Sequence, residues 1–235
     1  MAASLRAERA RRRGLRSSAV VLAVALVALA TGCRPAEPAT GRAGRVRVVL
    51  VLGDSVTYGL FGTTPRLHER LARRLADQHV RLVVDGFPGE TPIDTWPGNP
   101  SWAERLRGDI ERENPDMVVI QTMLLPRASD PARQDAYRAA IRGLYDIAQS
   151  RGAHVYVVSH PEPPVASERD ELRIAQRLQA EEAAGRGIST IPLDWWLNRC
   201  KGAYVTDGWH LSANGQECHA SAVAVAVAQL RAAVG

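Results

Sequence analysis

Short apolar runs alternate with longer amphipathic stretches along most of the chain, and this alternation restricts the fold more than any other feature. The first run, 46–52 (VRVVLVL), is rich in β-branched residues and ends at Gly53, as a buried strand does. The following stretch, 65–78, places Leu67, Leu71 and Leu75 at helical spacing with charged residues between them. We expect further strands at 81–84, 117–121, 154–159 and 189–193, and further helices at 101–113, 130–150, 167–184 and 212–233.

Five strands separated by helices predict an α/β protein with a parallel sheet and helices on both faces. The strand runs are apolar at consecutive positions, which is typical of strands covered on both sides. Only the last helix is ambiguous, because Val223, Val225 and Val227 alternate as they would in a strand. In a sheet of this kind, ligands bind beyond the carboxyl ends of the strands, so we look for functional residues there.

The first 32 residues have the three parts of an export signal: an arginine-rich start, an apolar run over 19–30 and small residues at its end. The apolar run is too short for an ordinary membrane span. Its end, Ala30-Thr31-Gly32-Cys33, resembles the lipobox of bacterial lipoproteins, in which the cysteine is acylated and becomes the mature N-terminus. A plain secretory signal is the alternative, and Arg12-Arg13 leaves a twin-arginine route open.

We therefore expect a signal peptide over 1–32, lipidation of Cys33, a Pro- and Gly-rich tether over 33–44 and one folded domain over 45–235. Such a protein would be exported and held at the outer side of a bacterial cell membrane by its lipid. Cys200 and Cys218 form an even pair in an exported chain, which favours a disulfide over two buried free thiols.

The basic pI of about 9.5 does not indicate a nucleic-acid-binding protein. The net charge is +5, and residues 1–32 alone carry six Arg and one Glu, so the rest of the chain is electrically balanced. A body without a basic excess lacks the usual means of gripping phosphates. The chain also has no GxGxxG or Walker loop and no HExxH spacing, so we expect no nucleotide, cofactor or metal ion.

Two segments contain residues suited to nucleophilic catalysis. The first strand ends in Gly53-Asp54-Ser55, where a strand-to-helix turn exposes the serine hydroxyl and directs its backbone N–H the same way. This is not a GxSxG nucleophile elbow, because Thr57 occupies the place of the second glycine. Near the other end of the chain, Asp207 precedes His210 by three residues, so its carboxylate can orient a histidine that accepts the serine proton.

Together these segments resemble the SGNH/GDSL hydrolase superfamily, over about 45–233. Gly53-Asp54-Ser55 matches its first motif, Asp207 and His210 match its last, and 85–91 (DGFPGET) is similar to its glycine-containing loop. The resemblance implies a three-layer α/β/α sandwich with a flavodoxin-like five-stranded parallel sheet. It also implies a cofactor-free serine esterase with Ser55, Asp207 and His210 as catalytic residues, and with the N–H groups of Ser55 and Gly89 as oxyanion donors.

One motif departs from the family pattern. Members usually follow the third strand with Gly-x-Asn-Asp, whose asparagine is a third oxyanion donor, but Leu125 stands at that position here. Gln121 and Arg127 are the nearest polar alternatives. The enzyme could therefore be slow, use another donor or have lost catalysis. We expect an acyl-ester substrate, for example an acetylated glycan or a lipid of the cell envelope; an acyltransferase or a non-catalytic glycan-binding domain are the alternatives.

Overall fold

The computed structural model describes residues 46–59, 66–76, 78–123, 125–162, 165–208 and 210–235. The expected signal peptide, Cys33 and the tether lie outside these residues and stay predictions. Of the helices within the described ranges, none is both long and apolar enough to cross a membrane.

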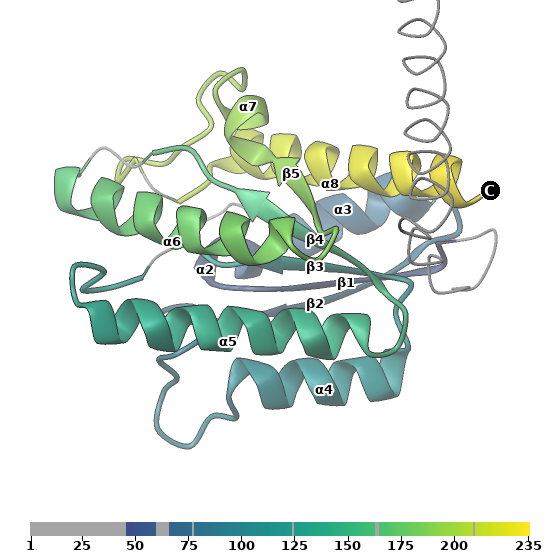
Figure 1. Ribbon diagram of the computed structural model, residues 1–235. Coiled ribbons are helices and arrows are strands. Elements are labelled where there is room, and N and C mark those ends of the chain that lie inside the picture. Colours follow the sequence, from purple (N-terminus) through teal and green to yellow (C-terminus); the bar gives the residue numbers. More distant parts are fainter. Residues whose placement is uncertain (1–45, 60–65, 77, 124, 163–164, 209) are drawn as a thin grey trace, which may run out of the picture. The chain divides into compact units, whose positions relative to one another are not determined.

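A single sheet of five parallel strands forms the centre of the folded domain (Figure 1). The strand order is β2-β1-β3-β4-β5, which is the flavodoxin-like order, so the predicted fold class is confirmed. Each strand lies within about two residues of an expected apolar run. The strands are β1 (Val48–Gly53), β2 (Arg81–Gly86), β3 (Met117–Gln121), β4 (His154–Ser159) and β5 (Ser189–Pro192).

Helices cover both faces of this sheet (Figure 1). On one face lie α2 (Ser55–Tyr58), α3 (Leu67–Ala76), α7 (Leu193–Leu197) and α8 (Ala213–Val234). On the other lie α4 (Trp102–Glu113), α5 (Pro131–Gln149) and α6 (Ala166–Ala184). The predicted helix at 212–233 is confirmed: Val223 and Val227, one turn apart, are buried against the sheet, whereas Val225 is exposed.

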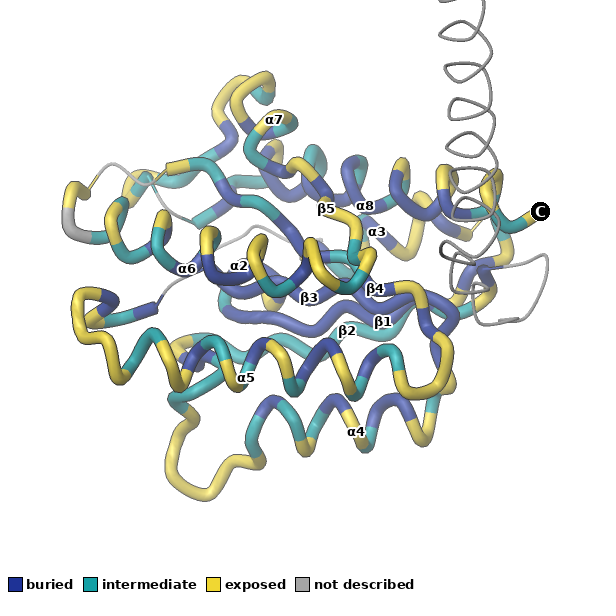
Figure 2. Tube along the Cα trace, in the orientation of Figure 1, coloured by how far each residue is buried: buried dark blue, intermediate teal, exposed yellow. Residues whose placement is uncertain are grey.

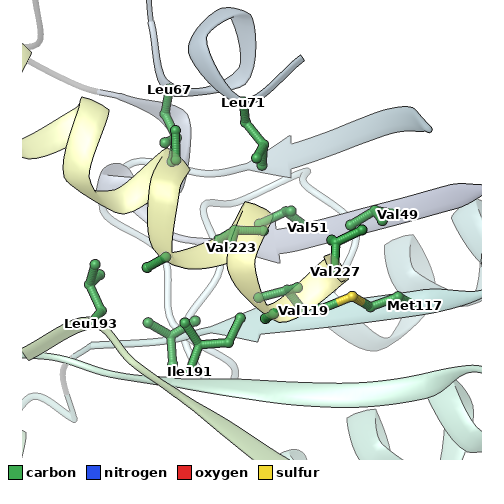
Figure 3. Close-up of a cluster of buried hydrophobic side chains, with 14 of the residues drawn as sticks. Val49, Val51, Leu67, Leu71, Met117, Val119, Ile191, Leu193, Val223 and Val227 are labelled. Atoms are coloured by element: carbon green, nitrogen blue, oxygen red, sulfur yellow. The ribbon is translucent and has the colours of Figure 1, made fainter. Parts of the chain in front are cut away.

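The core consists of two hydrophobic clusters separated by the sheet, as the burial colours in Figure 2 show. Successive residues of β1 serve both clusters: Val49 and Val51 point to the α3/α8 side, and Leu50 and Leu52 point to the α4/α5 side. Figure 3 shows the first cluster, where α3 and α8 pack on β1 and β3. This double burial explains why the strand sequences are apolar at every position.

Two short helices were not expected from the sequence. The expected strand at 189–193 ends at Pro192, and α7 begins directly after it; α2 follows β1 after the single residue Asp54. Helices of four or five residues are too short to show a hydrophobic period. Both lie beyond the carboxyl ends of their strands, at the edge of the sheet where the candidate residues also lie.

Candidate active site

Ser55 is the first residue of α2, immediately beyond β1. Asp54 caps this helix, with its Oδ1 accepting a hydrogen bond from the N–H of Val56 at 3.0 Å. Gly53 is required because a Cβ there would lie 2.0 Å from Thr57 Oγ1 and 2.7 Å from the carbonyl oxygen of Gln121. The Gly-Asp-Ser sequence therefore builds a tight strand-to-helix turn that leaves Ser55 half-buried at the end of the sheet.

Asp207 and His210 lie on the loop between α7 and α8. The loop closes on itself: Val205 N–H donates to the carbonyl of His210 at 2.9 Å, and Gly208 N–H donates to the carbonyl of Val205 at 2.9 Å. Asp207 Oδ1 accepts from the backbone N–H of His210 at 2.9 Å, and its Oδ2 lies 2.8 Å from His210 Nδ1. One carboxylate thus holds both the backbone and the ring of the histidine.

The structure brings the three predicted catalytic side chains together. His210 Nε2 lies 3.2 Å from Ser55 Oγ, although the two residues are 155 positions apart in the sequence. The His210 side chain is 13% exposed and that of Asp207 is 42% exposed, so the carboxylate meets solvent while the ring is largely sheltered. This is the geometry in which a neutral imidazole can accept a proton from the serine hydroxyl.

The expected disulfide between Cys200 and Cys218 is present. It joins the segment after α7 to the second turn of α8, on either side of the loop that carries Asp207 and His210. The same loop is held at its end by Ser212, whose N–H donates to the carbonyl of Ala203 at 2.8 Å. The position of His210 therefore rests on a covalent link as well as on hydrogen bonds.

The two predicted oxyanion donors are the backbone N–H groups of Ser55 and Gly89. The N–H groups of Ser55 and Gly89 donate no hydrogen bond within the described residues. The loop that carries Gly89 is attached to β1, because Phe87 N–H donates to the carbonyl of Gly53 at 2.9 Å. Gly89 has φ +75°, a conformation that favours glycine. The oxyanion role of both N–H groups stays a prediction.

In the described part of the segment after β3, no side chain is shown to act as a third donor. Leu125 is completely buried in the α4/α5 cluster. Gln121 is also fully buried, and its amide atoms find no partner within the described residues; Arg127 is exposed, and its backbone N–H donates to Glu171 at 2.8 Å. Neither alternative donor makes a contact with Ser55 or His210 among the contacts of the described residues. In place of a family asparagine, Met123 contributes its N–H to Asp54 Oδ2 at 2.9 Å.

Burial changes the protonation of two groups behind the site. Desolvation raises the pKa of Asp54 to about 6, although hydrogen bonds from the backbone N–H groups of Val56 and Met123 act to lower it. Desolvation lowers the pKa of His160, at the end of β4, to about 3, with a smaller contribution from His219. At neutral pH Asp54 is mostly an anion and His160 is neutral, so the positive charge formed during catalysis would be confined to His210.

Sequence reasoning missed the residues that shape the loop between β2 and α4. Glu90 is almost completely buried, and its Oε1 accepts from Asn99 Nδ2 at 2.6 Å and from Trp96 N–H at 3.2 Å. Arg133 of α5 joins this loop to the next one, because it bonds Asp94 and also donates to the carbonyl of Pro126 at 2.8 Å. The contact between Arg133 and Asp94 joins residues 39 positions apart, and no local sequence motif predicts any of these contacts.

Among the residues that the structure describes, no three His, Cys, Asp or Glu side chains are grouped so that they could hold a metal ion. Ser55, His210 and Asp207 instead lie in hydrogen-bonding sequence. Such an arrangement can support acyl transfer to a serine hydroxyl.

Solved structures with the same fold are numerous. TesA matches with a TM-score of 0.62 at 22% identity, over 78% of this chain and 99% of that one. Est24, a carbohydrate acetylesterase from Sinorhizobium meliloti, matches with a TM-score of 0.62 at 18% identity, over 78% and 99%. A Clostridium thermocellum family 3 carbohydrate esterase matches with a TM-score of 0.59 at 17% identity, over 81% and 100%. At these identities the likeness shows a shared fold.

No curated protein matches the sequence. A family model does: the GDSL-like Lipase/Acylhydrolase family model matches residues 51–218, well over half of the chain. The matched range begins within β1, before Ser55, and ends in α8, after His210, so it contains every residue of the site described above. The chain therefore belongs to the GDSL-like lipase/acylhydrolase family and is a hydrolase of the esterase type.

Proposed function

We propose that this hydrolase is an extracytoplasmic serine esterase in which Ser55, His210 and Asp207 form the catalytic triad. One observation carries the proposal: Ser55 Oγ lies 3.2 Å from His210 Nε2, and His210 Nδ1 lies 2.8 Å from Asp207 Oδ2. A nucleophile, a base and a group that orients the base are thus in hydrogen-bonding sequence, as acyl-enzyme chemistry requires.

In the first half-reaction, Ser55 Oγ attacks the ester carbonyl carbon while its proton passes to His210 Nε2. Asp207 accepts the Nδ1–H hydrogen bond, which keeps Nε2 as the accepting nitrogen and stabilises the imidazolium. The N–H groups of Ser55 and Gly89 donate to the oxyanion. When the tetrahedral intermediate collapses, His210 returns the proton to the departing alcohol oxygen, and the acyl group remains on Ser55.

In the second half-reaction, water attacks the acyl-enzyme, and His210 takes one of its protons and returns it to Ser55 Oγ. The products are a carboxylic acid and the free enzyme. No step requires a cofactor. If an alcohol replaced water as the acceptor, the same acyl-enzyme would make the protein an acyltransferase, so product analysis decides between the two reactions.

The substrate is an ester of a short acyl group, such as acetyl. A crevice of about 10 Å³ has Val56, Gly208 and Leu211 in its lining, each of which adjoins a triad residue in the sequence. That volume holds about one water-sized group, which favours a short acyl group over a long one. Two structural neighbours are named as carbohydrate esterases, which supports an acetylated glycan of the cell envelope as the substrate.

The test is labelling with a fluorophosphonate, which reacts with activated serines. We expect the purified domain to be labelled at Ser55, located by peptide mass spectrometry, and to hydrolyse ethyl acetate with release of acid. Ser55→Ala should abolish both, whereas Ser212→Ala, which alters a helix cap on the same loop, should leave the labelling site in place. Hydrolysis that persists unchanged in the Ser55→Ala variant would refute the mechanism.

The proposed location has its own test. If Cys33 carries a lipid, Cys33→Ser should move the protein from the membrane fraction to the soluble fraction of expressing bacteria, because the lipid chain supplies the attachment. Immunoblots of the two fractions measure the change. An unchanged membrane fraction would mean that the apolar run 19–30 is retained as the anchor.

A further inference from the structure

Trp96 is the most exposed large apolar side chain in the described part of the chain, with 59% of its surface accessible. It lies on the loop between β2 and α4, which is exposed in Figure 2. A single exposed ring does not by itself mark a binding site. Tryptophan is, however, enriched at interfaces because it combines an apolar ring with a polar N–H, so the fixation and the neighbours of this ring decide its role.

The ring is held in place rather than free to rotate. Its Nε1–H donates to the carbonyl of Pro88 at 3.2 Å, and its backbone N–H donates to Glu90 Oε1 at 3.2 Å. Asn99 donates to the same Glu90 oxygen and to the carbonyl of Trp96. These polar contacts stabilise the loop without help from the indole faces, so the ring is a preorganised surface for a ligand.

The ring also lies beside the candidate oxyanion donor. A Cβ built on Gly89 would be 3.3 Å from Trp96 Cζ2 and 3.4 Å from Nε1, so the indole rests directly against Gly89. In the proposed mechanism the ester carbonyl oxygen meets the Gly89 N–H, so the indole is within reach of a substituent of the ester. The surroundings of the ring decide which substituent this is.

We propose that Trp96 is the subsite for the sugar ring that carries the ester, an inference that rests on the proposed esterase function. The indole offers a flat apolar face to the C–H face of a pyranose. The exposed stretch 95–100 is open, because a Cβ at Gly98 would meet nothing within 4 Å, and it carries the polar side chains of Thr95 and Asn99. These polar neighbours favour a hydroxyl-bearing sugar over a long acyl chain as the group that covers the ring.

The test compares three esters: methyl tetra-O-acetylglucopyranoside, ethyl acetate and ethyl hexanoate. Covering the exposed indole should contribute about 10-fold to 30-fold in affinity. For Trp96→Ala we expect KM for the sugar acetate to rise by that factor with kcat within about threefold, and kcat/KM for both ethyl esters to stay unchanged. Trp96→Phe should restore most of the affinity for the sugar acetate, because it keeps a flat aromatic face.

Trp195→Ala is the matched control. Trp195 is also exposed, at 48%, but it lies on α7, after β5, at the opposite edge of the sheet from β2 (Figure 1). Four strand spacings separate the two edges, roughly 19 Å. This variant should leave all three esters unaffected. If Trp96→Ala affected ethyl hexanoate most, the ring would bind the acyl chain. If it affected all three esters equally, the ring would only position the loop. Either result, or no effect on any ester, would overturn the proposal.

Binding separates this inference from the proposed function. In the Ser55→Ala background, calorimetry should detect the sugar acetate, and adding Trp96→Ala should remove the signal. If wild-type protein hydrolyses no ester but the binding depends on Trp96, the esterase proposal fails and the sugar subsite stands. If ethyl acetate is hydrolysed through Ser55 but the sugar acetate binds equally with and without Trp96, the subsite fails alone.

Discussion

Gly89→Ala tests whether the loop after β2 takes part in the reaction. Gly89 has φ +75°, where an alanine costs about 1–2 kcal/mol relative to glycine. In addition, the new Cβ would be 3.3 Å from Cζ2 and 3.4 Å from Nε1 of Trp96, closer than a relaxed contact. The indole cannot retreat freely, because its Nε1–H is bonded to the carbonyl of Pro88. We expect the strained backbone at 89 to share in the adjustment, which moves its N–H.

We expect two separable effects. The strain should lower the melting temperature by about 2–8 °C for a domain of this size. Displacing the N–H should lower kcat for ethyl acetate by about 10² to 10³, because a misplaced oxyanion donor loses an interaction that is strongest in the transition state. KM should change little, since the ground-state carbonyl depends less on that bond.

Gly98→Ala provides the control for strain. Gly98 lies on the same loop and has φ +86°, so alanine there carries a similar backbone cost, but its Cβ would meet nothing within 4 Å. The melting temperature should fall about as much as in Gly89→Ala, while kcat for ethyl acetate stays within about threefold of wild type. Steady-state kinetics by titration of released acid and thermal melts provide both quantities. Equal kcat values for the two variants would refute Gly89 as a donor.

Three other predictions concern the framework of the site. Replacing Cys200 and Cys218 by serine should cost about 3 kcal/mol of stability and lower kcat, measured by urea melts and kinetics, because the link brackets the loop of His210. Burial lowers the pKa of His219 to about 3, so the folded state binds fewer protons than the unfolded state below pH 6.5, and stability falls as pH falls. Between pH 7 and pH 5 this amounts to about 2 kcal/mol, and His219→Leu should reduce the pH dependence of urea melts by that amount; an equal pH dependence would contradict it. Leu125→Asn should lower stability by about 3 kcal/mol without raising kcat, because it places an amide in an apolar cluster; a faster enzyme would show that position 125 reaches the oxyanion.

The fold could be predicted from the sequence because each strand is covered on both faces. Continuous apolar runs such as 117–121 and 154–159 coincide with β3 and β4 at both ends. The long helices were visible from their period and end signals, for example Asp130 and Pro131 at the start of α5. The helix α7 was not predicted, because five residues are too few to show a hydrophobic period. It begins at Leu193, which was expected to be the last residue of the strand before it.

The candidate site residues were predictable only where they belong to short sequence motifs. Asp207 and His210 are three residues apart, and Ser55 lies in a recognisable strand-to-helix turn, so two short motifs were enough to predict all three. The loop at 87–100 has no hydrophobic period, and its shape depends on the buried Glu90 and on Arg133 from a distant helix. Such contacts follow from tertiary packing and are invisible in a single sequence.

Asp54 explains how the site is built although Leu125 replaces the family asparagine. One carboxylate oxygen of Asp54 accepts from Val56 in α2, and the other accepts from Met123 in the segment after β3. Burial raises the pKa of this carboxyl to about 6, so the anion is kept at neutral pH against a desolvation cost. That cost is offset by two hydrogen bonds to the charged form, which lock the turn of Ser55 to the neighbouring strand. The segment after β3 thus supports the turn of Ser55 through its backbone, and the proposed mechanism needs only the N–H groups of Ser55 and Gly89 as oxyanion donors.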